Sequence, residues 1–163
     1  MELVLVRHGK AEPRDSFTSD HERALTADGV EQTKAAGKGL AKLIDPPDRV
    51  LTSDKTRAFQ TAELVAKPFK QTPEPWPLLG DGEPESIGEA VNQRAEARLM
   101  LVGHEPTFSE LIEWLCYGQA FGQTDMKKCG CAILDLTPGP ARPSAVLEAL
   151  LPPKVLRATA GKR

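Results

Sequence analysis

Two arginines and two histidines of this 163-residue chain lie at the end of, or shortly after, short apolar runs. They are Arg7, His8, Arg57 and His104. An arginine guanidinium binds phosphate oxygens through a planar fork that is always charged. A neutral imidazole can attack phosphorus through its lone pair, and a protonated imidazole stabilises oxygens that gain negative charge. These residue types therefore predict phosphoryl transfer with a histidine nucleophile, without a metal or another cofactor.

The elements that must position these side chains follow from the pattern of apolar residues. Strands are expected at residues 3–6, 50–52, 99–102, 132–136 and 145–150, and helices at 26–44, 53–65, 86–97 and 107–116. The first helix is counted from its expected N-cap, Thr26, and the second from a cap at Ser53 or Asp54. The alternation of strands and helices favours an α/β three-layer sandwich with a mostly parallel central sheet. Ligands bind beyond the carboxyl ends of such strands, so the four side chains should converge there.

Composition favours a cytoplasmic protein without a nucleic-acid partner. The net charge is −2 and 40% of the residues are hydrophobic, which suits one domain with a real core and no basic surface. The three cysteines form no CxxC pair and fit a reducing compartment. The apolar N-terminal run is too short for a signal peptide or a membrane span. We expect one domain over residues 1–151 and a loose basic tail over 152–163; the oligomeric state is left open.

Several segments match one enzyme family in the family's own order. They are VLVRHG at 4–9, RALTADG at 23–29, VLTS at 50–53 followed by RAFQTAE at 57–63, and LVGHEP at 101–106. On these motifs the chain resembles the histidine phosphatase superfamily, also called the phosphoglycerate-mutase-like family. Within it, the chain is similar to the SixA-type phosphohistidine phosphatases. The resemblance implies the phosphoglycerate-mutase-like fold.

The resemblance also implies roles for individual residues. It makes His8 the nucleophile that carries the phosphoryl group. Asp20 and Arg23 fall where the SixA type carries a polar pair beside the site. The phosphate pocket would consist of Arg7, His8, Arg57 and His104, with Arg23 and Ser53 as further candidates.

The identity of the proton donor is left open by the sequence. Other branches of the superfamily carry a glutamate in a long insert, but the corresponding region 66–98 is short here and mostly loop over 68–88. The candidates are Asp20, Glu83 and Glu85. We favour Asp20, either as the acid or as a group that places water, because the loop that carries it can fold back over His8.

A second departure from the SixA-type pattern follows the second expected strand. Many SixA-type chains have proline after the serine of this motif, whereas this chain has Asp54. Its carboxylate places a negative charge near a pocket for phosphate. A position at the start of the next helix, facing away from the anion, would accommodate that charge.

The short region 66–98 bears on the substrate. It leaves little chain to build a lid, and an open pocket suits phosphohistidine on the surface of another protein. Loss of an imidazole also depends less on a strong acid than loss of an alkoxide does. The alternative is a phosphatase of a small phosphoester in the same superfamily. A more remote alternative is a phosphate-binding regulatory module without turnover, which would have no need of His8.

A metal site is a further reading of the histidines. His8, His21 and His104, with Glu105, would supply the ligands. The chain has no HxH or HxxxH pair, and the two arginines expected beside a cation would repel it. The sequence therefore favours an anion in this pocket over a metal ion.

Overall fold

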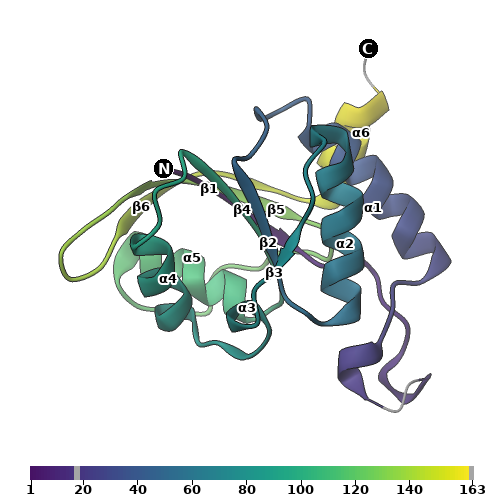
Figure 1. The fold of residues 1–163 in the computed structure, drawn as a ribbon, viewed down its shortest axis with the longest axis horizontal. Helices are drawn as coiled ribbons and strands as arrows, with labels where there is room; N and C mark the ends of the chain where they lie inside the picture. Colours follow the sequence, from purple (N-terminus) through teal and green to yellow (C-terminus); the bar gives the residue numbers. More distant parts are fainter. Residues whose placement is uncertain (17–18, 162–163) are drawn as a thin grey trace.

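The central sheet is mixed and mostly parallel in the computed structural model, which describes residues 1–16 and 19–161 (Figure 1). In the described residues the strands are β1 (Glu2–Arg7), β2 (Arg49–Thr52), β3 (Glu74–Pro75), β4 (Arg98–Gly103), β5 (Cys131–Thr137) and β6 (Ser144–Leu151). Their spatial order is β3-β2-β4-β1-β5-β6. The pairs β2–β3, β2–β4 and β1–β4 are parallel, and β1–β5 and β5–β6 are antiparallel. The parallel pairs bring the carboxyl ends of β1, β2 and β4 to one edge.

Helices cover both faces of this sheet, so the fold has three layers. One face carries α1 (Ala27–Leu40), α2 (Thr56–Ala66) and α6 (Pro153–Gly161), and the other carries α3 (Leu78–Asp81), α4 (Pro84–Asn92) and α5 (Thr107–Tyr117) (Figure 1). The α/β architecture expected from the sequence is confirmed. Within the described part of the chain, no helix is long and apolar enough to span a membrane.

The hydrophobic core is divided by the sheet into two clusters. Successive side chains of a strand point to opposite faces, which explains the division. The cluster on the side of α4 and α5 contains Leu3, Leu5, Leu99 and Leu101. The cluster on the side of α1 and α2 contains Val4, Val6, Met100 and Val102. The central strands are thus buried on both faces, as their continuous apolar runs predicted.

Several local predictions differ from the structure. The helix expected to reach residue 44 ends at Leu40. The region 68–88 was expected to be mostly loop, but it contains β3, α3 and the start of α4, which runs from Pro84 to Asn92 rather than from 86 to 97. Proline suits the first turn of a helix, because its missing N–H has no partner there anyway. The N-cap of α2 is Lys55, and neither Ser53 nor Asp54 caps it. Ser53 instead accepts a hydrogen bond from the Lys55 backbone N–H at 3.2 Å.

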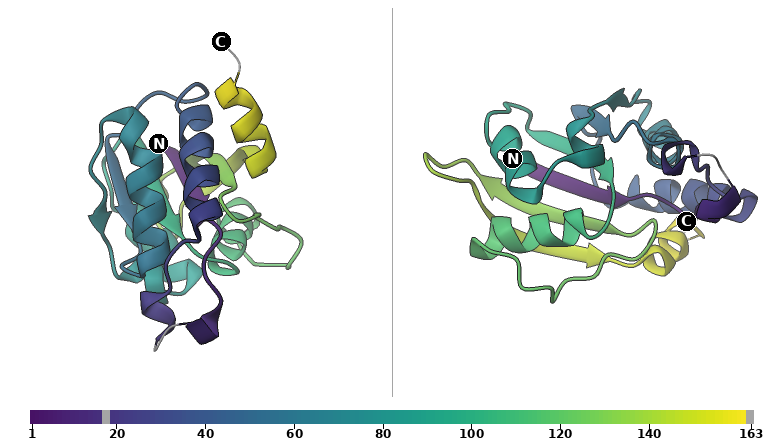
Figure 2. Two further views of the ribbon diagram at one scale, coloured as in Figure 1. Left: turned by 90° about the vertical axis from the view of Figure 1, so that its right-hand side faces the viewer. Right: turned by 90° about the horizontal axis from the view of Figure 1, so that it is seen from below.

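The C-terminal segment was predicted to be a loose tail, and this is wrong for residues 153–161. They form α6, which packs beside α1 (Figure 2, left). Leu156 is 1% exposed in the core cluster on that face, and the Lys42 ammonium donates to the carbonyls of Thr159 and Ala160. Gly39 allows the close approach, since a Cβ there would lie 1.8 Å from the Leu156 carbonyl oxygen. Residues 162–163 lie outside the described residues, and the domain boundary at 151 stays a prediction.

Leu156→Ala should lower the free energy of unfolding by about 2–4 kcal/mol, because it removes a fully buried leucine side chain and leaves a cavity. Urea denaturation of the variant and the parent measures this difference. Val155→Ala is the matched control, since Val155 is 39% exposed on the same helix and should cost much less. An effect of Leu156→Ala within about 0.5 kcal/mol of zero would mean that α6 adds nothing to the core.

Candidate active site

The site begins where the hydrogen-bond ladder of the sheet extends one residue beyond the strands. The His8 N–H donates to the Gly103 carbonyl at 3.0 Å, and the Ser53 N–H donates to the Val102 carbonyl at 3.0 Å. His104 follows directly after β4. Because β1 and β2 flank β4, these bonds fix His8 and Ser53 on either side of the end of β4. The convergence predicted from the sequence is therefore present for these three residues.

The two imidazoles lie against each other in a buried position. Their ring centroids are 5.3 Å apart, and His8 and His104 are 6% and 8% exposed. His8 Nδ1 is 2.7 Å from the Gly9 carbonyl oxygen. A carbonyl only accepts hydrogen bonds, so Nδ1 carries the proton and Nε2 keeps a free lone pair. This tautomer is the one that a histidine nucleophile needs.

Both imidazoles are held in the neutral form. Burial lowers the pKa of His8 to about 4. The hydrogen bond to Gly9 opposes this shift, and the charges of Arg57, Arg7 and Arg23 add to it. Burial, then the neighbouring His8, Arg57 and Lys55, lowers the pKa of His104 to about 3. His104 was expected to act as a cation. With this low pKa His104 is neutral at neutral pH, and a bound dianion would favour its protonation.

Arg57, in the first turn of α2, is held by Asp20 from the short 3-10 helix Asp20–Glu22. Its two terminal nitrogens donate to the Asp20 carbonyl at 2.8 Å and to the Asp20 carboxylate at 3.0 Å. The same carboxylate lies 3.4 Å from Arg23 Nε and 3.7 Å from Arg14 Nε. Asp20 thus fixes the guanidinium of Arg57 and links the loop after β1 to α2.

The pKa of Asp20 bears on its expected role as the acid. Burial raises this pKa, but the charge and hydrogen bond of Arg57, with the charges of Arg23 and Arg14, outweigh burial and hold it below its ordinary value. A general acid needs the opposite shift. The pairing therefore favours an anchoring role for Asp20 over the acid role.

Arg7 is positioned by the loop that connects α5 to β5. Its Nη1 donates to the Met126 carbonyl at 2.8 Å. The Met126 N–H donates to the Ser109 hydroxyl oxygen at 3.3 Å, and Ser109 in turn donates through its N–H and hydroxyl to the Glu105 carboxylate. The Cys129 N–H is shared between the carbonyls of Arg7 and His8, at 3.1 and 3.0 Å. Sequence reasoning missed this support, because main-chain acceptors in a loop leave no mark in residue type.

Glu113 anchors the same loop. Its carboxylate, on a side chain that is 2% exposed, accepts the backbone N–H groups of Phe121, Gly122 and Gln123. These bonds, led by that of Phe121, lower the pKa of Glu113 to about 2 against the opposing effect of burial. The charged form is therefore retained at neutral pH and holds the loop that reaches Arg7. A charged residue in an otherwise apolar stretch of α5 was the available signal for this role.

Three buried nitrogen atoms of the pocket, Arg7 Nε, Arg57 Nε and His104 Nδ1, have no hydrogen-bond partner among the residues that the structure describes. Arg23 Nε beside them also lacks a hydrogen bond, although it lies 3.4 Å from the Asp20 carboxylate. Buried polar groups in proteins are almost always paired, since an unpaired one costs about 1–3 kcal/mol. An anion between the three residues would satisfy these donors and neutralise the two guanidiniums. The arrangement is suited to a tetrahedral oxyanion such as phosphate.

The remaining predicted residues are distributed between the pocket and its surroundings. Arg23 donates to the Glu12 carbonyl at 3.4 Å, and its side chain is 15% exposed beside Asp20. Glu83 and Glu85 are exposed at the start of α4, and no described contact links them to the pocket. Ser53 is fully buried, and its hydroxyl lies 2.8 Å from His104 Nε2.

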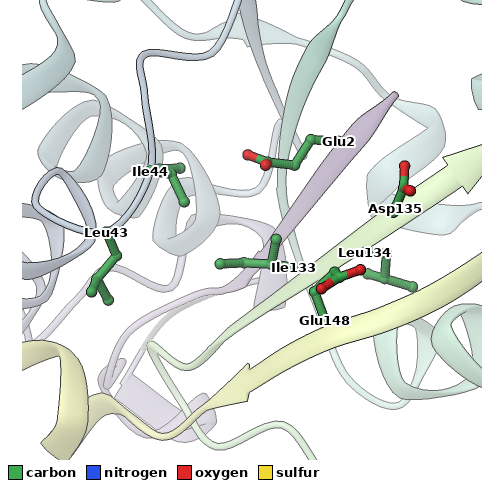
Figure 3. A pocket seen from close by; sticks show the side chains of 7 residues that line it. All are labelled: Glu2, Leu43, Ile44, Ile133, Leu134, Asp135 and Glu148. Carbon is green, nitrogen blue, oxygen red and sulfur yellow. The ribbon is translucent and has the colours of Figure 1, made fainter.

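A separate pocket of about 340 Å³ lies at the other end of β1. Figure 3 shows its acidic and apolar lining, which includes Glu2, Asp135 and Glu148. β1 starts at Glu2 and ends at Arg7, so this pocket is at the opposite edge of the sheet from the imidazoles. In residues 1–16 and 19–161, no group of three His, Cys, Asp or Glu side chains is arranged to hold a metal ion.

Comparisons with known proteins agree with this geometry. The family model described as histidine phosphatase superfamily (branch 1) matches residues 3–98. An uncharacterized protein of Picosynechococcus is 35% identical, over 87% of this chain and 88% of that protein. A 2,3-bisphosphoglycerate-dependent phosphoglycerate mutase of Histophilus somni is 40% identical over 44% of this chain, which spans only 32% of the mutase. The solved structure of the protein histidine phosphatase SixA complexed with tungstate has a TM-score of 0.82 at 23% identity, covering 96% of this chain and 99% of SixA.

Ser109→Ala should weaken the binding of inorganic phosphate about 5- to 30-fold. The change leaves the buried Met126 N–H unpaired, at about 1–2 kcal/mol, and frees the carbonyl that orients Arg7. Isothermal titration with phosphate measures the affinity, and thermal unfolding shows whether the variant is folded. Ser86→Ala, at an exposed position of α4, is the control and should bind like the parent. Parental affinity in a folded Ser109→Ala protein would contradict the support assigned to this loop.

Proposed function

The chain belongs to branch 1 of the histidine phosphatase superfamily, and from this premise we propose that it hydrolyses phosphohistidine on a protein through a phosphoryl intermediate on His8. One observation carries the proposal. His8 keeps Nε2 unprotonated, because its Nδ1–H is bound to the Gly9 carbonyl, and it lies in a site whose buried donors from Arg7, Arg57 and His104 are unpaired. A nucleophile and an anion pocket thus occur together.

The first half-reaction transfers the phosphoryl group to the protein. His8 Nε2 attacks phosphorus, the bond between phosphorus and the leaving nitrogen breaks, and the leaving imidazole takes up a proton. Arg7 and Arg57 bind the phosphoryl oxygens, whose charge offsets the mutual repulsion of the guanidiniums. His104 donates a hydrogen bond from Nδ1 when the anion is present. No step requires a metal ion.

The second half-reaction releases inorganic phosphate. A water molecule attacks phosphorus, the bond to His8 Nε2 breaks, and the imidazole returns to its neutral tautomer. The Gly9 carbonyl accepts from Nδ1 throughout, so the ring keeps its orientation in both halves. Asp20 keeps its role as an anchor, since its contact with Arg57 holds that guanidinium against the departing phosphate.

The walls of the site support a substrate on a protein surface. Most of the segment between β2 and β4 is committed to the core, since α4 packs on α5 and buries Ile87 and Val91. The four-residue α3 comes near the catalytic corner, where a Cβ at Gly80 would lie 3.3 Å from the Ser53 hydroxyl oxygen. Within the described residues, the segment between β2 and β4 thus contributes little chain that could cover the site. A phosphorylated histidine presented by another protein can then enter.

Two substrates, a protein phosphorylated on histidine and p-nitrophenyl phosphate, should both label His8 with ³²P. The adduct should be labile in acid and stable in alkali, as expected for a phosphoramidate, and kcat/KM should be at least about tenfold higher for the phosphorylated protein. Rapid alkaline quench and scintillation counting measure the adduct, and phosphate release measures turnover.

His8→Asn is the matched variant, because it keeps a polar side chain without the nucleophile, and it should lose both the label and turnover. Retained turnover by this variant would overturn the proposed intermediate. If both substrates label His8 equally but kcat/KM is higher for small phosphoesters, the proposed intermediate stands and the proposed substrate is wrong. Phosphate binding without any label would favour a regulatory module.

A further inference from the structure

The reaction needs a proton donor that the groups around the anion do not supply. His8 is the nucleophile, and burial first of all lowers the pKa of His104 to about 3. Asp20 is held by three arginines as a carboxylate. Glu83 and Glu85 make no described contact with the pocket. A poor leaving group, which does not leave readily as an anion, would therefore need a proton from another residue.

His21 and Asp54 form a pair beside the site that the mechanism above does not use. His21 Nε2 lies 3.5 Å from an Asp54 carboxylate oxygen, with the two side chains 53% and 43% exposed. His21 belongs to the 3-10 helix of the loop after β1, whereas Asp54 belongs to the corner between β2 and α2. The pair therefore joins two segments that are far apart in the sequence.

The neighbours of this pair on each segment belong to the anion site. His21 directly follows Asp20, which binds Arg57 through both its carbonyl and its carboxylate. Asp54 directly follows Ser53, whose hydroxyl oxygen lies 2.8 Å from His104 Nε2. The pair is thus one residue removed from the partners of Arg57 and His104, and it remains in contact with solvent. This adjacency places the pair beside the anion site, and its exposure leaves it open to an incoming substrate.

We propose that His21, oriented by Asp54, is the proton donor to the leaving group. The proposal rests on the proposed function, because it requires phosphoryl transfer to His8. An imidazole can both give and take a proton, and a carboxylate beside it fixes the orientation of the ring. In this proposal the Asp54 carboxylate orients His21, which gives a role to the residue that replaces the proline of many SixA-type chains.

The proton balance closes over the two half-reactions. In the first, the His21 imidazolium gives its proton to the departing oxygen or nitrogen as the bond from that atom to phosphorus breaks and the bond to His8 Nε2 forms. In the second, neutral His21 takes a proton from the attacking water as the hydroxyl oxygen bonds to phosphorus and the bond to His8 breaks. Phosphate leaves, and His21 is again an imidazolium.

The His21 imidazole is in contact with the Asp54 carboxylate from the corner after β2. Asp20 and Glu22 belong to the same turn as His21, and Asp20 is itself paired with Arg57, Arg23 and Arg14. Transfer to a poor leaving group should therefore depend on His21, whereas transfer from a good leaving group should depend on it little.

The test compares two aryl phosphates, p-nitrophenyl phosphate with a good leaving group and phenyl phosphate with a poor one. We expect His21→Gln to lower kcat/KM on phenyl phosphate about 100-fold or more and on p-nitrophenyl phosphate less than about fivefold. Asp54→Asn should act in the same direction by a smaller factor. Glu22→Gln, in the same turn, is the control and should leave both substrates unaffected.

Two further measurements separate this proposal from its alternatives. The inhibition constant of inorganic phosphate should be unchanged in His21→Gln, since the anion pocket is intact. Equal losses on both aryl phosphates, with or without weaker phosphate inhibition, would make His21 a structural residue and overturn the proposal. If His8 is not labelled in the parent protein, the proposed function is overturned. If His8 is labelled and His21→Gln is as active as the parent, only this inference is overturned.

Discussion

The whole site depends on the parallel pairing of β1 and β2 with β4. The ladder extends past the strands, so that the N–H groups of His8 and Ser53 bond to the last two carbonyls of β4. His104, the next residue of that chain segment, is thereby held 5.3 Å from the His8 ring and within hydrogen-bond distance of Ser53. A shift of register by one residue would reverse the faces of every side chain in the strand and separate these groups. The pairing of the core strands thus also aligns the residues of the site.

The cost of the arrangement is electrostatic. Arginines and protonated imidazoles that converge in one buried site repel each other. This repulsion is reduced because both imidazoles are neutral and one carboxylate is paired with an arginine. Burial accounts for most of the low pKa values of His8 and His104, and Asp20 offsets the charge of Arg57. An incoming phosphoryl group supplies the remaining negative charge.

The sequence was sufficient for the features that depend on local pattern. Apolar runs located the strands, and the polar residues that end them identified His8, Arg57 and His104. The sequence did not reveal the partners of these residues, because they come from distant segments. Met126 orients Arg7 from a loop about 120 residues away in the sequence. The sequence also did not indicate the contact between Asp20 and Arg57, which favours an anchoring role for Asp20 over the predicted acid role. The prediction of a loose tail is wrong for residues 153–161, because packing of α6 on α1 around Leu156 is a tertiary contact that the sequence pattern did not indicate.

The central claim is that three strand ends form one binding place for a tetrahedral anion, and a crystal structure with vanadate tests it most directly. We expect the vanadium within bonding distance of His8 Nε2, with the vanadate oxygens accepting hydrogen bonds from Arg7, Arg57 and His104. His8→Asn crystals in the same solution should show the oxygens at the same donors without the bond to residue 8. Vanadate at another place, with Arg57 turned toward solvent and His8 unbound, would contradict the account.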